Sequence, residues 1–333
     1  MSLDSLKSKD AILPAVAGGI LGAAAVYLMV ARPATAKAAK LEHDLEVAKH
    51  FEIELHECGL KTEVLRGRQL EAALPAERKP EDHATRPNVA PGELAVFIAP
   101  ICPFAHRAWL TALEKCGPKG FRAIHVPLGR DCKPKWYSEV YEKGTVPSLQ
   151  MGPDFTLGDS IPVCKWIDEH MDGPTLSPQD TASKEAVERV IALFGSKIVG
   201  PCYSLLKNKD PALDYEKGKK VLAGCEWFDD VLAFRGAGIE GSPFFCGEKF
   251  GLFECLTCSF FERFRNTLKH WRGCDILDSK YGRRDHLNYW LDAIEKRPSF
   301  QLSRRAGEYY IHCYASYADN NQRVWDALAP KEE

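Results

Sequence analysis

Cys102 is the side chain best placed for chemistry, because it stands where a predicted strand gives way to a predicted helix. An apolar run at residues 94–98 indicates a buried strand, and residues 101–109 read ICPFAHRAW. Pro103 suits the first helical position, which has no intrahelical N–H partner to lose. Cys102 would then be the N-cap, where unpaired backbone N–H groups and the helix dipole favour an anion and lower the pKa of the thiol toward neutrality.

Only one sulfur is offered by this motif, since the residue three after Cys102 is Ala105 rather than a second cysteine. The predicted chemistry therefore uses one protein thiol and borrows the second from a small thiol. The competing interpretation is a small buried hydrophobe, the commonest fate of a free cysteine. The position before a proline at a helix start favours a reactive thiol.

Other side chains have more than one interpretation. His106, one helical turn after Cys102, could be a base or a ligand, but we expect a half-exposed helix histidine. Arg107 could raise the local positive potential or form a structural ion pair. Cys116 and Cys132 could resolve a mixed disulfide, although the sequence does not fix their distance from Cys102. A group of aromatic residues could line a substrate cleft or pack in the core: Trp136, Tyr137, Tyr309, Tyr310 and Tyr314.

Cys255 and Cys258 form a Cys-x-x-Cys pair that could be redox-active or bind a metal with Cys246 or Cys274. They lie in an apolar helical segment, where positions i and i+3 face the same core, and no second close pair accompanies them. We predict core packing for this pair and no metal site.

The composition excludes some functions. A chain of 333 residues is long enough for two domains, and 44 basic against 46 acidic residues argue against a nucleic-acid partner, which normally requires a basic excess. Twelve cysteines without regular spacing are not typical of a disulfide framework in so long a chain. We expect them to be mostly reduced, in a thiol-rich compartment.

Residues 11–31 carry no charge and are long enough to span a bilayer core of about 30 Å. The alternative is a cleaved signal or transit segment, for which Ala34, Thr35 and Ala36 offer an acceptable cleavage site. The run is longer than a usual signal core and the preceding ten residues carry as many acids as bases, which favours a single N-terminal membrane anchor. Basic residues after the run predict that the catalytic domain faces the cytosol or another reducing compartment.

The pattern along the chain predicts five segments. Residues 1–10 are an N-terminal tail, 11–31 the transmembrane helix, and 32–92 a helical stalk and proline-rich linker. Residues 93–174 and 175–329 form two folded domains.

Within residues 93–174 the predicted order is β-α-β followed by β-β-α, which is typical of a thioredoxin-like domain. The predicted strands lie near residues 94–98, 121–126, 146–151 and 155–157, and a helix with Ser160 as N-cap runs to about residue 171. Helices are predicted from Thr181, from the pair Asp210 and Pro211 to about residue 234, and at residues 253–270 and 286–295. The fold class is therefore an α/β domain followed by an all-helical domain.

Several short motifs resemble the glutathione transferase superfamily, in particular its cysteine-type lambda and omega classes. They occur in the family's order: CPFAHR at 102–107, KPKWY at 133–137, VPSL at 146–149, LGDS at 157–160, KWID at 165–168 and GPTL at 173–176. The last two are most similar to the lambda class. FFCG at 244–247 and FFERF at 260–264 extend the resemblance through the helical domain, over residues 94–300.

The resemblance implies a glutathione site. Cys102 matches the catalytic cysteine, and Pro147 matches a proline whose preceding bond is cis and leaves the backbone of Val146 free to pair with the cysteinyl part of glutathione. Asp159 and Ser160 match an acid-serine pair that binds the γ-glutamyl end. The remaining implied contacts are Lys133, at the glycyl end, and Phe104.

Two departures from the family pattern stand out. Asp159 replaces the glutamate common in these two classes, which shortens the acid by one methylene and keeps its charge. In the helical domain, Gly251 and Glu254 replace the usual Ser or Thr cap and the Asp three residues later. Because glycine has no side chain, this replacement weakens the capping box.

The activity implied is that of a glutathione-dependent thiol oxidoreductase, acting on small or protein-bound disulfides and glutathionylated substrates through a mixed disulfide of Cys102 with glutathione. Dehydroascorbate reduction is a further option, and conjugation should be weak. The alternative class is a non-catalytic protein: a membrane-tethered carrier of glutathione adducts, or a protein similar to the intracellular chloride channels. The sequence leaves open whether the chain is a monomer or a dimer.

Overall fold

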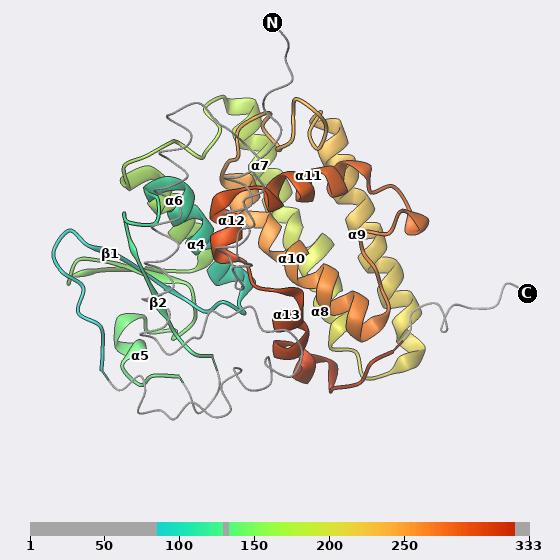
Figure 1. The fold of residues 1–333 in the computed structure, drawn as a ribbon, viewed down its shortest axis with the longest axis horizontal. Coiled ribbons are helices and arrows are strands. Elements are labelled where there is room, and N and C mark those ends of the chain that lie inside the picture. The colour runs from blue at the N-terminus through green and yellow to red at the C-terminus, as the bar shows by residue number, and fades with distance from the viewer. Residues whose placement is uncertain (1–84, 129–132, 324–333) are drawn as a thin grey trace, which may run out of the picture.

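The computed structural model describes residues 85–128 and 133–323. Within these ranges a small sheet with its helices lies beside a larger all-helical part (Figure 1). The predicted tail, the transmembrane helix at 11–31 and most of the stalk and linker lie outside the described residues, and so does Cys132.

The first part is built on a four-stranded sheet in the order β2-β1-β3-β4. Strand β1 (Leu94–Ile98) is parallel to β2 (Arg122–His125) and antiparallel to β3 (Ser148–Met151), which is antiparallel to β4 (Phe155–Gly158). All five residues of β1 are buried, as an unbroken apolar run requires when a central strand is covered on both faces. The predicted thioredoxin-like order is confirmed.

Helices α4 (Pro103–Cys116) and α6 (Ser160–His170) pack against each other beside this sheet, and the short α5 (Tyr137–Val140) follows β2. Asp168 of α6 holds the segment that connects the two parts. Its carboxylate accepts hydrogen bonds from the N–H groups of Leu176 and Ser177, at 2.8 and 2.9 Å. It also accepts one from the Lys115 ammonium of α4, at 3.3 Å. The linker between the two parts is thus fixed to both helices.

The second part is mainly helical, with helix α10 at its centre (Figure 1). Its α-helices are α7 (Thr181–Phe194), α8 (Gly200–Leu206), α9 (Asp214–Phe234), α10 (Leu252–Arg272), α11 (Asp285–Glu295), α12 (Pro298–Ser303) and α13 (Gly307–Cys313). A π-helical turn (Gly195–Val199) joins α7 to α8, and 3-10 turns lie at Pro211–Leu213, Ser279–Tyr281 and Ala315–Ala318. The helix expected to begin at Asp210 and Pro211 opens with a 3-10 turn, in which the Asp210 carboxylate accepts from the N–H of Ala212.

One helical run among the described residues, Thr181–Leu206, is long and apolar enough to cross a membrane by length and composition. Its inner face carries Phe194, Ile198 and Cys202, which are buried where the run packs against α9 and α10. We therefore assign this run to the core of the helical domain.

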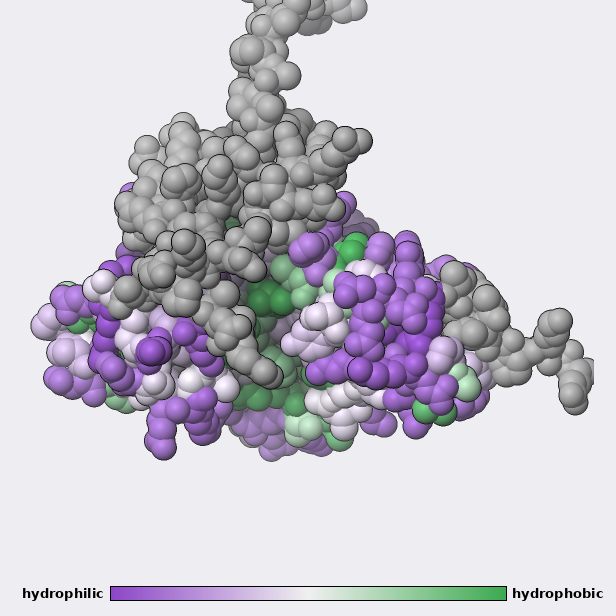
Figure 2. Space-filling model, turned by 90° about the horizontal axis from the view of Figure 1, so that it is seen from below, coloured by the Kyte–Doolittle hydropathy of each residue, from purple (hydrophilic) through white to green (hydrophobic). Residues whose placement is uncertain are grey.

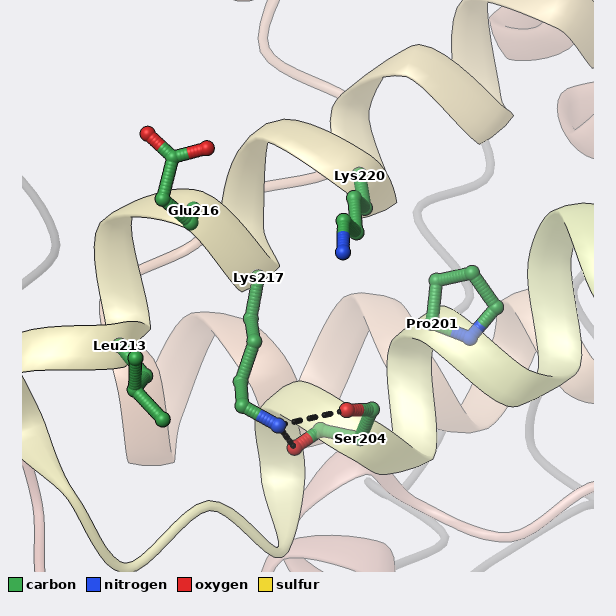
Figure 3. Close-up of a pocket in the computed structure, with 6 residues that line it drawn as sticks. All are labelled: Pro201, Ser204, Leu213, Glu216, Lys217 and Lys220. Atoms are coloured by element: carbon green, nitrogen blue, oxygen red, sulfur yellow. Dashed lines mark hydrogen bonds between the residues drawn. The ribbon is translucent and has the colours of Figure 1, made fainter.

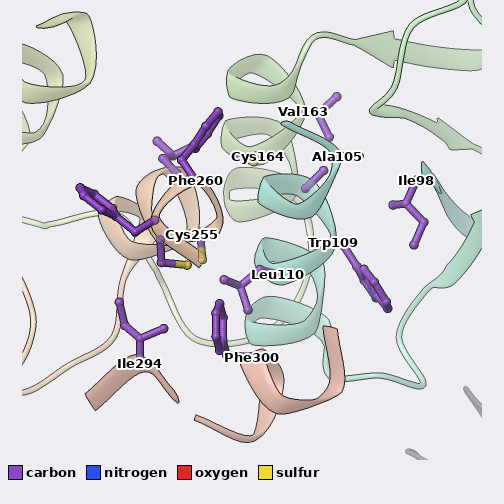
Figure 4. Packing of buried hydrophobic residues seen from close by; sticks show 14 of the residues in the cluster. Ile98, Ala105, Trp109, Leu110, Val163, Cys164, Cys255, Phe260, Ile294 and Phe300 are labelled. Carbon is purple, nitrogen blue, oxygen red and sulfur yellow. The ribbon is translucent and has the colours of Figure 1, made fainter. Parts of the chain in front are cut away.

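Helix α10 is the common wall of the two parts, since it packs on α4 as well as on its helical neighbours (Figure 4). Cys255 and Cys258 are fully buried in it, and burial raises the pKa of both thiols well above the ordinary value. The prediction of core packing for this pair is confirmed. At the start of α10, the Glu254 carboxylate accepts from the N–H of Gly251 at 3.0 Å, so one half of the capping box remains.

His106 lies inside the junction of the two parts, 1% exposed, and the expectation of a half-exposed histidine is wrong. Its Nδ1 accepts from Nη1 of Arg263 at 3.0 Å, because a guanidinium can only donate. The proton therefore sits on Nε2, which donates to Ser303 Oγ at 2.7 Å. The helical period placed His106 on α4 correctly, but the histidine is buried because α10 and α12 cover that face.

Burial holds the pKa of His106 well below 6.5, and the positive charges of Arg263, Arg305 and Arg304 lower it further. Because the unfolded chain binds a proton on this histidine that the folded chain does not, folding is favoured above pH 6.5 and loses stability as the pH falls below it.

We expect His106→Asn, which keeps an acceptor for Arg263, to flatten the loss of stability between pH 7 and pH 5. The wild-type slope from this residue is limited to about 1.4 kcal/mol per pH unit. Denaturant unfolding at several pH values, with the wild type and the variant compared at each, measures the difference. Parallel curves for the two proteins would contradict this assignment.

Candidate functional site

Three chain segments that carry predicted site residues meet at one edge of the sheet. The pairing places Phe97 opposite Ser148, and Ser148 opposite Gly158. The end of β1, the start of β3 and the end of β4 are therefore adjacent. The loop that leads to Cys102, the Val146–Pro147 peptide and Asp159 consequently lie side by side.

Cys102 is the N-cap of α4, with φ −77° and ψ 118°, and it is half-buried. Its Sγ lies 4.0 Å from the carbonyl oxygen of Val146, to which the thiol donates. The Val146–Pro147 peptide is cis, as the resemblance implied. The predicted thiol and the predicted glutathione-binding backbone thus face each other.

The pKa of the Cys102 thiol is raised above its ordinary value, whereas the helix start had suggested a lowered one. Burial is the largest cause. The backbone N–H groups of Ala105 and Phe104 and the positive charges of Arg263 and Arg107 act in the opposite direction and offset it only in part. Helix geometry provides the expected donors, but the sequence alone gave no measure of the burial that opposes them.

Asp159, not Ser160, is the N-cap of α6. Asp159 has φ 68°, a left-handed conformation that is unusual for a residue other than glycine and is often found at functional sites. Its exposed carboxylate pairs with Nζ of Lys143 at 2.9 Å. Ser160 lies one residue inside the helix, where its buried hydroxyl accepts from Nη1 of Arg107 at 3.1 Å.

Arg107 bridges three helices. Besides its bond to Ser160 of α6, its Nε donates to the carbonyl of Leu256 in α10 at 2.7 Å, and its guanidinium lies 4.6 Å from the centre of the Phe260 ring. Burial lowers the pKa of Arg107 to about 10. Since these partners are a hydroxyl, a carbonyl and an aromatic ring, Arg107 positions the helix starts around Cys102 rather than forming the ion pair considered from the sequence.

The other two predicted residues border this edge. Phe104 is 38% exposed and meets Phe260 edge to face, with ring centres 5.0 Å apart. Lys133 is exposed, and its Nζ lies close to Gly144. A Cβ atom built on that glycine would be 3.4 Å from the Lys133 Nζ. Lys133 therefore lies beside the loop that leads to Val146.

Tyr137 is a positioning residue that the sequence left ambiguous. Its hydroxyl donates to the carbonyl of Thr145 at 2.9 Å and lies 3.0 Å from Ser148 Oγ, so it holds the loop on both sides of the cis peptide. Lys143 was not predicted, because nothing in the local pattern marks it. The KPKWY motif could have singled out Tyr137.

Cys116 does not serve as a resolving cysteine. It ends α4, 14 residues after Cys102, which at about 1.5 Å per residue is about 20 Å along the helix. Burial also raises the pKa of its thiol to about 11. Cys132, the other residue considered for this role, lies outside the described residues.

The face of the molecule flanked by α5 and α13 is hollowed between the two parts, and the floor of the hollow is apolar (Figure 2). Tyrosines of the helical domain approach the Cys102 loop. Tyr314 Oη donates to the carbonyl of Ile101 at 3.2 Å and lies 3.3 Å from Tyr203 Oη. Lys207 Nζ lies 5.0 Å from the centre of the Tyr203 ring and 4.7 Å from that of Tyr317.

A second hollow, of about 230 Å³, lies between α8 and α9 and has no predicted site residue in its lining (Figure 3). Its wall includes Lys217, whose Nζ donates to the hydroxyl of Ser204 at 2.8 Å. The candidate site is therefore the sheet edge at Cys102 and not this surface hollow.

Comparison with known proteins agrees with this geometry. Residues 96–175 match the model of the glutathione S-transferase N-terminal domain. The chain is 30% identical to Protein IN2-1 of Zea mays over 66% of this chain and 83% of that protein. It is 26% identical to Glutathione S-transferase L3 of Arabidopsis thaliana over 66% and 85%.

The fold is also similar to that of the crystal structure of glutathione transferase Omega 3C from Trametes versicolor, with a TM-score of 0.57 and 19% identity over 75% of this chain and 96% of that one. The fold and the sequence similarity agree. The chain belongs to the glutathione S-transferase superfamily, whose members use glutathione as co-substrate.

Proposed function

We propose that this protein is a glutathione-dependent thiol oxidoreductase that works through a mixed disulfide of Cys102 with glutathione. The observation that carries the proposal is the half-buried Cys102 thiol at the start of α4, 4.0 Å from the Val146 carbonyl. Ala105 stands in the place of a second cysteine and Cys116 lies at the far end of α4, so in this proposal glutathione supplies the second thiol.

The groups around Cys102 suit the three parts of glutathione. The backbone of Val146 offers hydrogen bonds to the cysteinyl part, since its carbonyl oxygen lies 4.0 Å from the Cys102 sulfur. Asp159 and the start of α6 suit the γ-glutamyl end, since a carboxylate binds an ammonium and helix N–H groups bind a carboxylate. Lys133 suits the glycyl carboxylate.

The proposed reaction consists of two successive thiol–disulfide exchanges. The Cys102 thiolate attacks the glutathionyl sulfur of a mixed disulfide, the substrate leaves as a thiolate that takes up a proton, and Cys102 becomes bonded to glutathione. The thiolate of a second glutathione then attacks that glutathionyl sulfur. Oxidised glutathione forms, and the Cys102 thiolate is released. Dehydroascorbate, which accepts two electrons from two glutathione molecules, is a further substrate under this proposal.

Conjugation should be weak. Transferases that conjugate glutathione keep its sulfur as a free thiolate beside a hydroxyl group, whereas a cysteine in that place forms a disulfide with it.

The non-catalytic carrier is the second candidate, and the raised pKa of Cys102 favours it, because a protonated thiol attacks disulfides slowly.

We expect Cys102→Ser in the full chain to lose glutathione-dependent reduction of a glutathionylated peptide by roughly 10³-fold or more, as the loss of a nucleophile does in other enzymes. Cys116→Ser is the matched control and should retain turnover. A coupled assay for oxidised glutathione measures both. Full activity in Cys102→Ser would reject the mechanism, and glutathione binding without turnover in the wild type would favour the carrier.

Asp159→Asn should weaken glutathione binding by about tenfold, or about 1.4 kcal/mol, because the amide cannot pair with an ammonium. The effect stays modest because the carboxylate is 55% exposed to solvent. Asp154→Asn, at an exposed position in the turn at the other end of β4, is the matched control. Calorimetric titration with glutathione measures both variants, and equal affinities would remove Asp159 from the site.

We further propose that residues 11–31 anchor the protein in a membrane with the folded domains on the reducing side. The support is the uncharged run itself, together with a thiol mechanism that requires a reducing compartment. Substrates would then be reached beside a membrane.

Full-length protein expressed in its host cell should remain in the membrane pellet after alkaline carbonate extraction, and a chain that lacks residues 1–35 should be released. Mass spectrometry of the mature N-terminus provides the decisive measurement. A mature chain that begins near Lys37 would establish a cleaved segment and end the anchor hypothesis.

A further inference from the structure

We propose that Arg263 of α10 is a positioning residue for the Cys102 thiolate: it binds the two carbonyl groups that precede Cys102 and supplies the buried positive charge that the thiolate balances. Its consequence for turnover rests on the function proposed above. The proposal itself concerns the ionisation of one thiol, which can be measured without turnover.

Arg263 is 1% exposed and reaches from the helical domain into the loop before α4. Its Nε donates to the carbonyl of Ile101 at 2.8 Å, and its Nη2 donates to that of Pro100 at 2.7 Å. Nη1 donates to His106 at 3.0 Å and to the carbonyl of Ser259 at 2.8 Å. One guanidinium therefore fixes the chain on both sides of Cys102.

The three carbonyl groups that precede Cys102 each have a donor. Ala99 accepts from the N–H of Cys102 at 2.9 Å, and the carbonyls of Pro100 and Ile101 accept from the guanidinium. Tyr314 Oη adds a second bond to Ile101 at 3.2 Å. A carbonyl oxygen carries a partial negative charge and repels a nearby thiolate. A hydrogen-bond donor on that oxygen offsets its charge, so these bonds reduce the repulsion that a thiolate at Cys102 would experience.

Among the described residues, no carboxylate accepts a hydrogen bond from Arg263 or forms an ion pair with it. The acceptors of its hydrogen bonds are three carbonyls and a neutral imidazole, although a guanidinium is always charged. The adjacent Glu262 carboxylate acts on Arg263 electrostatically, but its ion pairs are with Arg265 at 2.7 Å and with Arg304 at 2.9 Å. Because a buried charge is costly without a counter-charge, ionisation of Cys102 supplies one.

The ionisable side chains that face Cys102 from the surrounding elements are Arg107 of α4, Tyr137 of α5, Tyr203 of α8, Arg263 of α10 and Tyr314 after α13. Burial raises the pKa of the three phenols, to about 12 for Tyr203, so they stay neutral. The two guanidinium groups are the positive ones among them, and both lower the pKa of the thiol.

Arg272 provides a matched control on the same helix. It is also buried, at 2% exposed, and donates to backbone carbonyls, among them those of Leu205 and Leu206. It lies nine residues after Arg263, about 13 Å along the helix. Substitution of Arg272 therefore removes a similar structural contact and leaves the surroundings of Cys102 intact.

The test is the pH dependence of Cys102 alkylation by iodoacetamide in the full chain, followed by mass spectrometry of the peptide that carries Cys102. We expect Arg263→Met to raise the apparent pKa by about one unit and to slow alkylation below that pKa about tenfold. Arg263→Lys keeps the positive charge but cannot bind both carbonyl groups as the guanidinium does, so it should recover part of the alkylation rate. Arg272→Met should lower the melting temperature without moving the profile.

An unchanged Cys102 profile in folded Arg263→Met, or an equal shift in Arg272→Met, would overturn the proposal. If Arg263→Met does not fold, Arg263→Gln, which is neutral but keeps one donor group, must show a shift in the same direction. If Arg263→Met shifts the pH profile of Cys102 alkylation but the wild type reduces no disulfide, the role of Arg263 is upheld and the proposed turnover is rejected. Failure of this proposal and failure of the proposed function are therefore distinguishable.

Discussion

The site depends on two guanidinium groups that cross the boundary between the domains in opposite directions. Arg107 leaves α4 and donates to the carbonyl of Leu256 in α10, while Arg263 leaves α10 and donates to the carbonyls that precede Cys102. Each is buried, so each needs its acceptors in order to offset the cost of desolvation. Neither domain can shift relative to the other without breaking these hydrogen bonds. Contacts from both domains therefore determine the position of Cys102 relative to β3.

The same burial that fixes the thiol opposes its ionisation. The start of α4 provides the donors expected of a helix N-terminus, yet burial outweighs them and the pKa of Cys102 remains above its ordinary value. A thiol of raised pKa is less ionised at neutral pH, so it attacks disulfides slowly, and it is also a poor leaving group. Burial therefore slows both the formation of a mixed disulfide and its resolution, and the donors and positive charges around Cys102 oppose this effect.

The sequence predicted what local signals determine. The apolar run of β1, the proline after Cys102 and the periodicity of α10 each act within a few residues, and the strands and helices they predict are present. The family motifs located the cis peptide at Pro147, although pattern alone placed the cap of α6 one residue late, at Ser160.

What the sequence could not predict depends on partners far away in the chain. His106 and Arg263 are separated by 157 residues, and neither has a local pattern that identifies the other. The burial of His106, the sign of the Cys102 pKa shift and the role of Arg263 all follow from the packing of α10 on α4. A helical period shows which face a residue occupies, but not which element covers that face.

Asp159 shows how a departure from the family pattern can be accommodated. Its shorter side chain is carried by a left-handed backbone conformation at the start of α6, and its carboxylate is already paired with the Lys143 ammonium at 2.9 Å. Binding of a γ-glutamyl group would replace one ammonium by another, so the net charge around the carboxylate would not change. Since Lys143 and Asp159 are 63% and 55% exposed, solvent screens their pairing and the exchange costs little. Under the proposed function, the γ-glutamyl ammonium would take the position that the Lys143 ammonium has in the free protein.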